Sequence, residues 1–311
     1  MTNYRKPKII VIAGPTASGK TSLGVALSLA LGGEIVNADS MQVYRGMDVG
    51  TAKPTVEEQR RVPHHLIDVV NPDEEYNAAI YRSMALPIIR EILSKGKMCF
   101  VVGGTGLYIK SLLGGLFKCP PADLKIRASL FREYDFLGAV RLHERLKRLD
   151  PDSARKIHPN DRMRLIRALE IVRLTNRLPS DLSMEHNFGD RPLNALVLCL
   201  KVDREELYQR INVRSRSMAE SGLVEETKML LRQGYAPELK PMKAIGYRHM
   251  IKYLNRDWSL DDAICGIQRD TRRYAKRQLT WFRAEPEINW VAPERFDFIL
   301  QKIKDFSPRA T

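Results

Sequence analysis

An eight-residue loop limits the folds open to this 311-residue chain. The segment GPTASGKT (residues 14–21) matches the phosphate-binding pattern G-x-x-x-x-G-K-[ST]. It follows the apolar, β-branched run Lys8–Ala13 and precedes Lys20–Leu31, where apolar residues recur on one side of a predicted helix. Glycines let the backbone wrap around phosphate oxygens, and the helix N-terminus favours an anion. Strand, loop and helix together predict a phosphate site; an accidental glycine-rich turn is the alternative.

The rest of the chain alternates between strand and helix patterns. We predict further strands over residues 34–38, 98–102, 194–200 and 288–291, and a helix near residues 77–95 that Pro87 should kink or interrupt. After Lys118 the Cys119-Pro120-Pro121 segment breaks the pattern, and residues 122–182 form short arginine-rich helical segments. This order predicts an α/β fold with a parallel sheet. Its core spans residues 1–118 and 192–311, and residues 119–191 form an all-helical insertion.

Polar side chains are expected to gather beside the loop. Lys20 adds a mobile positive charge, and the Thr21 hydroxyl lies where it could ligate Mg²⁺. Asp39 and Ser40 follow the second strand, so they should emerge at the carboxyl edge of the sheet, where ligands bind in such folds. Asp39 is a candidate general base or Mg²⁺ partner, and a turn cap is the equal alternative.

Two features bear on the class of protein. The third strand ends in GGTGLY (residues 103–108) without the carboxylate that ATPase motors use to hold Mg²⁺, and Asp68 follows too short an apolar run to replace it. This favours small-molecule kinases and other pyrophosphate users. The net charge of +14 favours a polyanionic partner such as nucleic acid, although a merely basic enzyme would also carry it.

The expected setting is the reducing cytoplasm. The four cysteines are scattered and show no zinc or redox spacing. No stretch approaches the length that spans a bilayer, so we expect no membrane association.

Several segments at these spacings resemble the bacterial type of the tRNA dimethylallyltransferase family. The phosphate loop alone would be unspecific, but the matches run through most of the chain. They are GPTASGKT (14–21), ADSMQVYRGMDVGTAKP (38–54), PHHLIDV (63–69), VGGTGLY (102–108), HPND with RALE (158–170), AIGYR (244–248) and AKRQLTWFR (275–283).

The resemblance implies a P-loop core like that of nucleoside kinases and a prenyl transfer that requires Mg²⁺. A dimethylallyl group would pass from dimethylallyl pyrophosphate to N6 of the adenosine at tRNA position 37, 3′ of the anticodon. Asp39, Lys20 and Arg214 would be catalytic, with Asp39 taking the N6 proton and Thr21 ligating the metal; Arg216 is the rival to Arg214. The pyrophosphate would lie against Gly14, Pro15, Thr16, Ala17, Ser18, Gly19, Lys20, Thr21 and Arg214.

The family positions for tRNA fall in several segments, and a monomer is expected. Arg164 and Arg167 share a helix face while Ile166 and Leu169 can face the core of the insertion, and Tyr247 would offer a base-stacking surface. Tyr274 and Trp281 should anchor the basic C-terminal helix. For each basic pair taken alone, a solvated face is the commoner outcome. The positions for tRNA are Asp39, Ser40, Met41, Gln42, Thr105, Arg127, Met163, Arg164, Leu165, Ile166, Arg167, Lys243, Ala244, Ile245, Gly246, Tyr247 and Arg248.

The sequence departs from the family pattern at two points, and two other functions are open to it. Asn176 replaces a common glycine, and no Cys/His cluster follows Cys265, so the zinc finger of eukaryotic relatives is missing from this sequence. A kinase using the loop for ATP would be indifferent to tRNA. A non-catalytic tRNA-binding protein would release no pyrophosphate.

Overall fold

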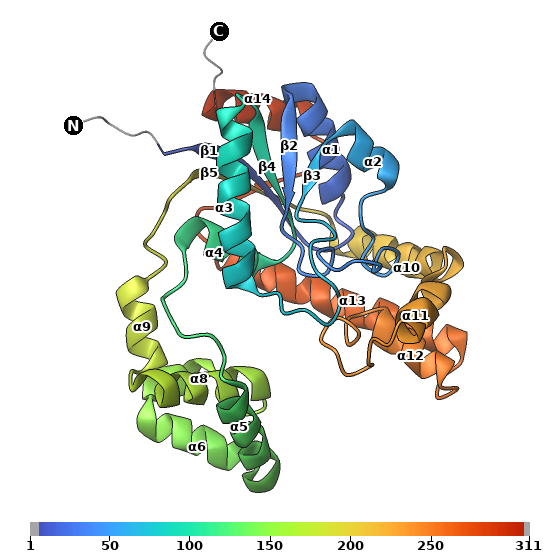
Figure 1. The fold of residues 1–311 in the computed structure, drawn as a ribbon. Coiled ribbons are helices and arrows are strands. Elements are labelled where there is room, and N and C mark those ends of the chain that lie inside the picture. Colours follow the sequence, from blue (N-terminus) through green and yellow to red (C-terminus); the bar gives the residue numbers. More distant parts are fainter. Residues whose placement is uncertain (1–5, 308–311) are drawn as a thin grey trace, which may run out of the picture. The chain divides into compact units, whose positions relative to one another are not determined.

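A computed structural model describes residues 6–307 and divides the chain into two compact units (Figure 1). The core unit comprises residues up to 113 and from 192 onwards, and the helical unit comprises residues 114–191. No helix within the described residues is both long enough and apolar enough to cross a membrane.

The core unit is built on a six-stranded sheet whose described strands pair in parallel. The strand order is β3-β2-β4-β1-β5-β6. The central strand β1 pairs with β4 on one side, where Ile10 faces Phe100, and with β5 on the other, where Ile10 faces Leu196. The strands are β1 (Lys8–Ala13), β2 (Gly33–Asn37), β3 (His64–His65), β4 (Met98–Gly103), β5 (Asn194–Leu200) and β6 (Asn289–Val291).

The α/β parallel sheet is therefore confirmed, with the predicted strands displaced by at most one residue at their ends. The two-residue strand β3 was not predicted because its sequence, His64-His65, carries no apolar pattern. The helices of this unit are α1 (Lys20–Leu31), α2 (Val56–Arg61), α3 (Ala78–Ser94), α4 (Gly106–Gly114), α10 (Arg204–Glu220), α11 (Leu223–Arg232), α12 (Tyr247–Leu254), α13 (Leu260–Arg283) and α14 (Phe296–Phe306).

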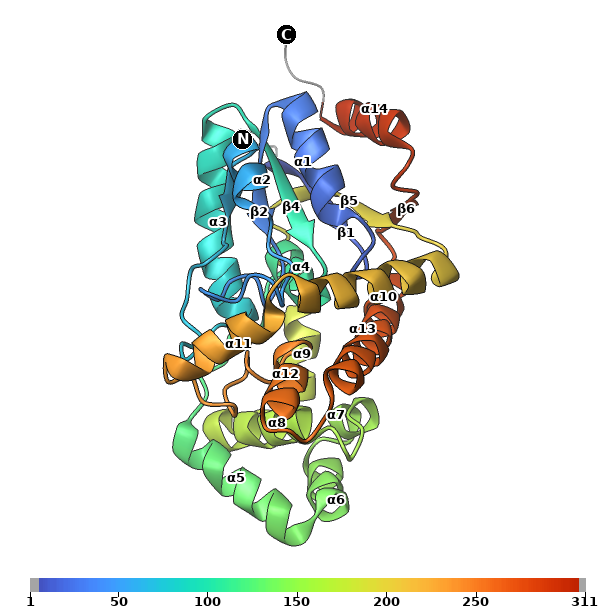
Figure 2. The same cartoon turned by 90° about the vertical axis from the view of Figure 1, so that its right-hand side faces the viewer.

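Helices cover both faces of the sheet (Figure 2). On one face, Leu23 and Leu27 of α1 pack with Ile299 of α14 and with alternate strand residues such as Ile10 and Phe100. Helix α3 lies on the opposite face. At the lower end of the strands in Figure 2, α10 and α13 cross the carboxyl edge of the sheet. These two helices therefore enclose the carboxyl edge of the sheet, where the loops after the strands meet.

Pro87 does not interrupt helix α3, so that alternative of the prediction is wrong. The helix continues from Ala78 to Ser94 and buries Tyr81, Ala85 and Ile89. Pro87 and Ser83, whose carbonyl loses its usual partner, are both exposed to solvent. Water can satisfy that carbonyl, and the packing of the buried face outweighs the cost of one lost backbone bond.

The helical unit has a core of its own. Its helices surround a buried cluster that includes Leu130, Leu142, Leu146, Leu165 and Leu169. The helices are α5 (Leu124–Leu137), α6 (Ala139–Leu149), α7 (Pro151–Lys156), α8 (Arg162–Thr175) and α9 (Pro179–His186).

Candidate active site

The loop of residues 14–21 joins β1 to α1 with a backbone suited to anions. Gly14 and Gly19 adopt φ angles of 147° and 88°, which disfavour other residues. No side chain among the described residues caps α1, which begins at Lys20. The N–H groups of its first turn are therefore not capped by a side chain and are available to a negatively charged ligand at the helix N-terminus.

Helix α13 holds the loop of residues 14–21 in place through hydrogen bonds of the Gln278 side chain. The side-chain Oε1 of Gln278 accepts the Thr16 N–H at 2.8 Å, and its Nε2 donates to the Gly104 carbonyl at 2.9 Å. Gln278 is buried. A Cβ on Gly104 would lie 2.3 Å from Nε2, so only glycine leaves room for this bridge. Gln278 thus connects the phosphate loop, the loop after β4 and α13.

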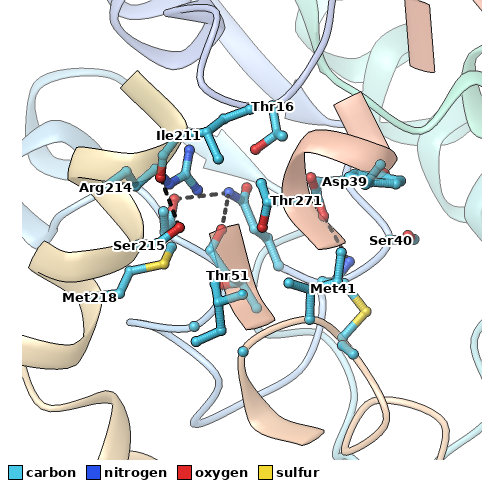
Figure 3. Close-up of a pocket in the computed structure, with 18 of the residues that line it drawn as sticks. Thr16, Asp39, Ser40, Met41, Thr51, Ile211, Arg214, Ser215, Met218 and Thr271 are labelled. Carbon is cyan, nitrogen blue, oxygen red and sulfur yellow. Dashed lines mark hydrogen bonds between the residues drawn. The ribbon is translucent and has the colours of Figure 1, made fainter. Parts of the chain in front are cut away.

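A cavity of about 360 Å³ opens between these elements in the core unit. Figure 3 shows Arg214, Ser215 and Met218 of α10 on one side of it and Asp39, Ser40 and Met41 on the other. Its walls also include Thr16, Lys20, Thr21, Gln42, Gly50, Thr51, Ala52, Ile211, Ala244, Ile245, Gly246, Tyr247, Arg248, Ile267, Thr271, Tyr274, Arg277 and Gln278.

Two cations and a carboxylate meet in this pocket. Burial lowers the pKa of Lys20 to about 8, although the Asp39 carboxylate opposes the shift, and Lys20 Nζ donates to the Pro15 carbonyl at 2.6 Å. Burial also lowers the pKa of Arg214, again opposed by Asp39. Arg214 lines the pocket, whereas Arg216 is exposed and lies outside its walls. The structure therefore places Arg214, and not its rival, beside Lys20.

Asp39 is held in a defined position by its neighbours. Its N–H donates to Asn37 Oδ1 at 3.1 Å, and its Oδ1 accepts the Met41 N–H at 2.8 Å. Asp39 is therefore a turn cap, as one alternative predicted. Its second oxygen, Oδ2, makes no hydrogen bond to any residue between 6 and 307. One oxygen fixes the turn, and the other is available to a ligand in the pocket.

Tyr274 lines the pocket beside Asp39, although the sequence suggested only an anchoring role for it. Burial, and next the Asp39 charge, raise the pKa of Tyr274 far above its ordinary value. The Thr105 side chain lies near the Tyr274 hydroxyl, and its oxygen accepts the Ser40 N–H at 3.0 Å. Trp281 contacts Gly106, where a Cβ would lie 2.2 Å from its Nε1, but the residue is 39% exposed, so its anchoring role stays a prediction.

Two groups of predicted tRNA-binding residues need correction. Tyr247 lines the pocket but its side chain is 0% exposed, so the predicted base-stacking surface is wrong. Leu165 and Ile166 are buried in the core of the helical unit, because they face inward on α8. The burial of Ile166 and Leu169 was expected. Their side chains form no surface for a partner.

The basic residues of the helical unit are partly neutralised. The Glu170 carboxylate is 0% exposed and accepts from Arg127 at 2.8 Å and from Arg167 at 2.7 Å. Arg164 is exposed and pairs with Asp161, and Met163 is also exposed. Arg127 and Arg167 therefore have a structural role within the unit, whatever else they contact.

Glu226 of α11 is a residue of the site that the sequence did not indicate. Its Oε2 accepts the N–H groups of Asp48 and Val49, both at 2.8 Å, and its Oε1 accepts the Gly50 N–H at 3.0 Å. Oε1 also accepts the Tyr247 hydroxyl at 2.7 Å. One nearly buried carboxylate thus holds the loop of residues 48–50, which leads into the pocket wall. A single Glu on an amphipathic helix gives no signal of this in the sequence.

Replacement of Glu226 by glutamine is expected to lower the free energy of unfolding by about 2 kcal/mol. The amide offers one acceptor and introduces a donor that would face the backbone N–H groups of residues 48–50. Urea unfolding measures the loss. Tyr247→Phe, which removes one of the four donors, should cost about 1 kcal/mol. Equal stability of the Glu226→Gln variant and the wild type would show that the carboxylate does not hold the loop.

Comparison with known proteins extends over almost the whole chain. The profile of the IPP transferase family matches residues 42–285, and that of the isopentenyl transferase family matches residues 7–68. A protein named tRNA dimethylallyltransferase from Geobacter sulfurreducens is 54% identical over 295 residues, covering 94% of this chain and 95% of the relative.

Solved structures agree with these sequence matches. A tRNA isopentenylpyrophosphate transferase from Bacillus halodurans is 41% identical, with a TM-score of 0.71 over 97% of this chain and 95% of its own. A eukaryotic dimethylallyltransferase, described as acting on tRNA, is 30% identical with a TM-score of 0.81 over 96% of this chain and 78% of its own.

Proposed function

The chain belongs to the IPP transferase family, and from this premise we propose that it is a tRNA dimethylallyltransferase. It would transfer the dimethylallyl group of dimethylallyl pyrophosphate to N6 of the adenosine at tRNA position 37, giving N6-isopentenyladenosine and pyrophosphate. The observation that carries this proposal is the shared pocket of Lys20, Arg214 and Asp39. A pyrophosphate site and an oriented carboxylate lie there in one cavity.

The proposed reaction needs both parts of this cavity. The N6 amine of adenine is a weak nucleophile because its lone pair is delocalised into the ring. As its lone pair forms the new N–C bond, the C–O bond to pyrophosphate breaks with positive charge developing on the allylic carbon. Lys20, Arg214 and the loop N–H groups stabilise the charge on the departing pyrophosphate. Asp39 Oδ2 accepts the N6 proton, which becomes acidic only as the N–C bond forms.

The residues present fit a Mg²⁺ ion that is held together with the substrate. Thr21 and Asp39 offer oxygen atoms in the pocket, whereas no group of three or more Cys, His, Asp or Glu within residues 6–307 could hold a metal by itself. Magnesium commonly binds through one or two protein oxygens together with substrate phosphates. Thr21 would be its protein ligand, and the bound ion would supply further positive charge at the pyrophosphate.

The pKa of Lys20 predicts a pH dependence. In the free enzyme the amine is charged below about pH 8 and neutral above it. Because the charged form binds pyrophosphate, kcat/KM for dimethylallyl pyrophosphate should fall above about pH 8, approaching tenfold per pH unit. Bound pyrophosphate raises the pKa of Lys20, so kcat should fall only at higher pH. A kcat/KM that stays flat from neutral pH to well above pH 8 would contradict the assignment of Lys20.

The tRNA would enter with the target adenosine extruded from the anticodon loop, where bases are unpaired or weakly stacked. Ser40, Met41, Gln42 and the 244–248 segment line the pocket into which the base must pass. Exposed Arg164 of the helical unit is a candidate phosphate contact.

A tRNA substrate and four free cysteines support a cytoplasmic location. The monomeric state stays a prediction for sedimentation measurements.

Pyrophosphate release tests the proposed function against the kinase alternative. With dimethylallyl pyrophosphate and Mg²⁺ present, we expect release that depends on unmodified tRNA and stops when adenosine 37 is replaced by a purine nucleoside without the N6 amine. A kinase would instead transfer phosphate from ATP to a nucleoside and ignore tRNA. Release of pyrophosphate from tRNA lacking that amine would contradict attack by N6.

A further inference from the structure

A second groove lies on the core unit, outside the walls of the active pocket. Its volume is about 660 Å³, and it is bordered by the start of α10, the C-terminal half of α13 and strand β6. Lys276, Leu279, Thr280 and Arg283 face it from α13, at the three- and four-residue spacing of one helix face. Tyr274 and Gln278, from another face of the same helix, line the active pocket instead.

Four cations border this groove: Lys201, Arg204, Lys276 and Arg283. All four are exposed, and none forms an ion pair with any other residue in the described part of the chain. Neighbouring arginines on α10 and α13 are paired, since Arg210 contacts Glu206 and Arg273 contacts Asp270. Asp203 is the acidic residue of the groove, and its Oδ1 already accepts the N–H groups of Glu205 and Glu206 as the cap of α10.

The floor of the groove is apolar and aromatic. Leu207 is buried there, with the half-buried residues Leu279, Tyr208 and Trp290 beside it. The Arg204 guanidinium lies 5.3 Å from the centre of the Tyr208 ring, and that of Arg272 lies 5.9 Å from it. Cations around aromatic rings form the combination that binds phosphates together with unpaired bases.

The spacing of the cations favours a ligand with several linked phosphates over a single phosphate group. Lys276 and Arg283 are seven residues apart on α13, which is about 10 Å along the helix axis. One phosphate group is too small to neutralise both, whereas a nucleic-acid strand carries one charge roughly every 3.4 Å of its axis. We propose that this groove binds a segment of the RNA backbone of the substrate tRNA, as a contact additional to the active pocket. The proposal rests on the proposed function, because it takes tRNA as the substrate.

Charge-reversal variants distinguish a specific contact at this groove from the general attraction between a basic protein and tRNA. The Lys276→Glu/Arg283→Glu variant should bind unmodified tRNA on the order of tenfold more weakly at low salt. The slope of log Kd against log salt should decrease by about one to two, because up to two phosphate contacts are lost. A matched control, Arg90→Glu/Lys304→Glu, changes the net charge equally at exposed residues outside the grooves and should retain both values. Lys276→Gln/Arg283→Gln should weaken binding by less.

The same measurements show what would overturn the proposal. If the groove variant and the control lose affinity equally, the groove makes no specific contact. If the groove variant loses binding of inorganic pyrophosphate but keeps its affinity for tRNA, the groove is a site for small anions. That result would also overturn the proposal. Nuclease footprinting should show tRNA phosphates that the wild type protects and the folded groove variant does not. If the wild type itself fails to bind tRNA, it is the proposed function that fails.

Discussion

Replacement of Asp39 by asparagine is expected to lower kcat for prenyl transfer by roughly 10²–10⁴-fold, the usual contribution of a positioned general base. The amide oxygen can still accept the Met41 N–H, so the turn after β2 should keep its shape. What is lost is the carboxylate oxygen that makes no hydrogen bond within the described residues. Without it, the N6 proton has no acceptor in this position of the pocket.

Single-turnover transfer and tRNA binding should respond differently to this substitution. The rate of transfer should fall, while the Kd for tRNA stays close to the wild-type value, because the neutral amide keeps the size of the side chain. Asp73→Asn, which removes a carboxylate from an exposed position, is the control and should have no effect. A wild-type rate in Asp39→Asn would assign the proton to another acceptor.

Replacement of Arg214 by methionine should lower kcat by on the order of 10²–10³-fold, as the loss of one electrostatic stabiliser of transition-state charge does elsewhere. Arg214 lines the pocket beside Lys20, and methionine preserves much of the length of its apolar stem. The charge on the departing pyrophosphate would then depend on Lys20, the loop N–H groups and the metal.

Arg216 supplies the matched control for this substitution. It lies two residues further along α10 but is exposed and outside the pocket walls. Arg216→Met removes the same charge from the same helix and should leave pyrophosphate release unchanged. If the two variants behaved alike, the positive charge of α10 as a whole, and not the position of Arg214, would be the relevant property.

Much of the fold could be predicted because its signals are local. Strands such as Lys8–Ala13 and Asn194–Leu200 are short apolar runs, and their bounds are those predicted. The continuous course of α3 through Pro87 was less predictable, because it depends on which side of the helix faces solvent. A local rule for proline cannot include tertiary packing or the access of water to a freed carbonyl.

The residues of the candidate site likewise differ in how far the sequence alone could predict them. Lys20, Thr21 and Asp39 follow strands, so the geometry of a parallel sheet brings them to one edge. Arg214 came from the resemblance, since nothing in its helix distinguishes it from Arg216. The roles of Glu226 and Gln278 were missed because the backbone groups that they hold lie more than 170 residues away in sequence. Their roles arise from contacts that only the folded chain creates, as does the burial of Tyr247.

This pocket is expected to join a prenyl group to the adenosine beside the anticodon. The most direct measurement incubates the protein with unmodified tRNA, Mg²⁺ and dimethylallyl pyrophosphate labelled in the prenyl carbons, followed by digestion and mass spectrometry of the nucleosides. We predict labelled N6-isopentenyladenosine at position 37 and one pyrophosphate released for each group transferred. Active, folded protein that leaves the tRNA unlabelled, or that labels a different nucleoside, would contradict it.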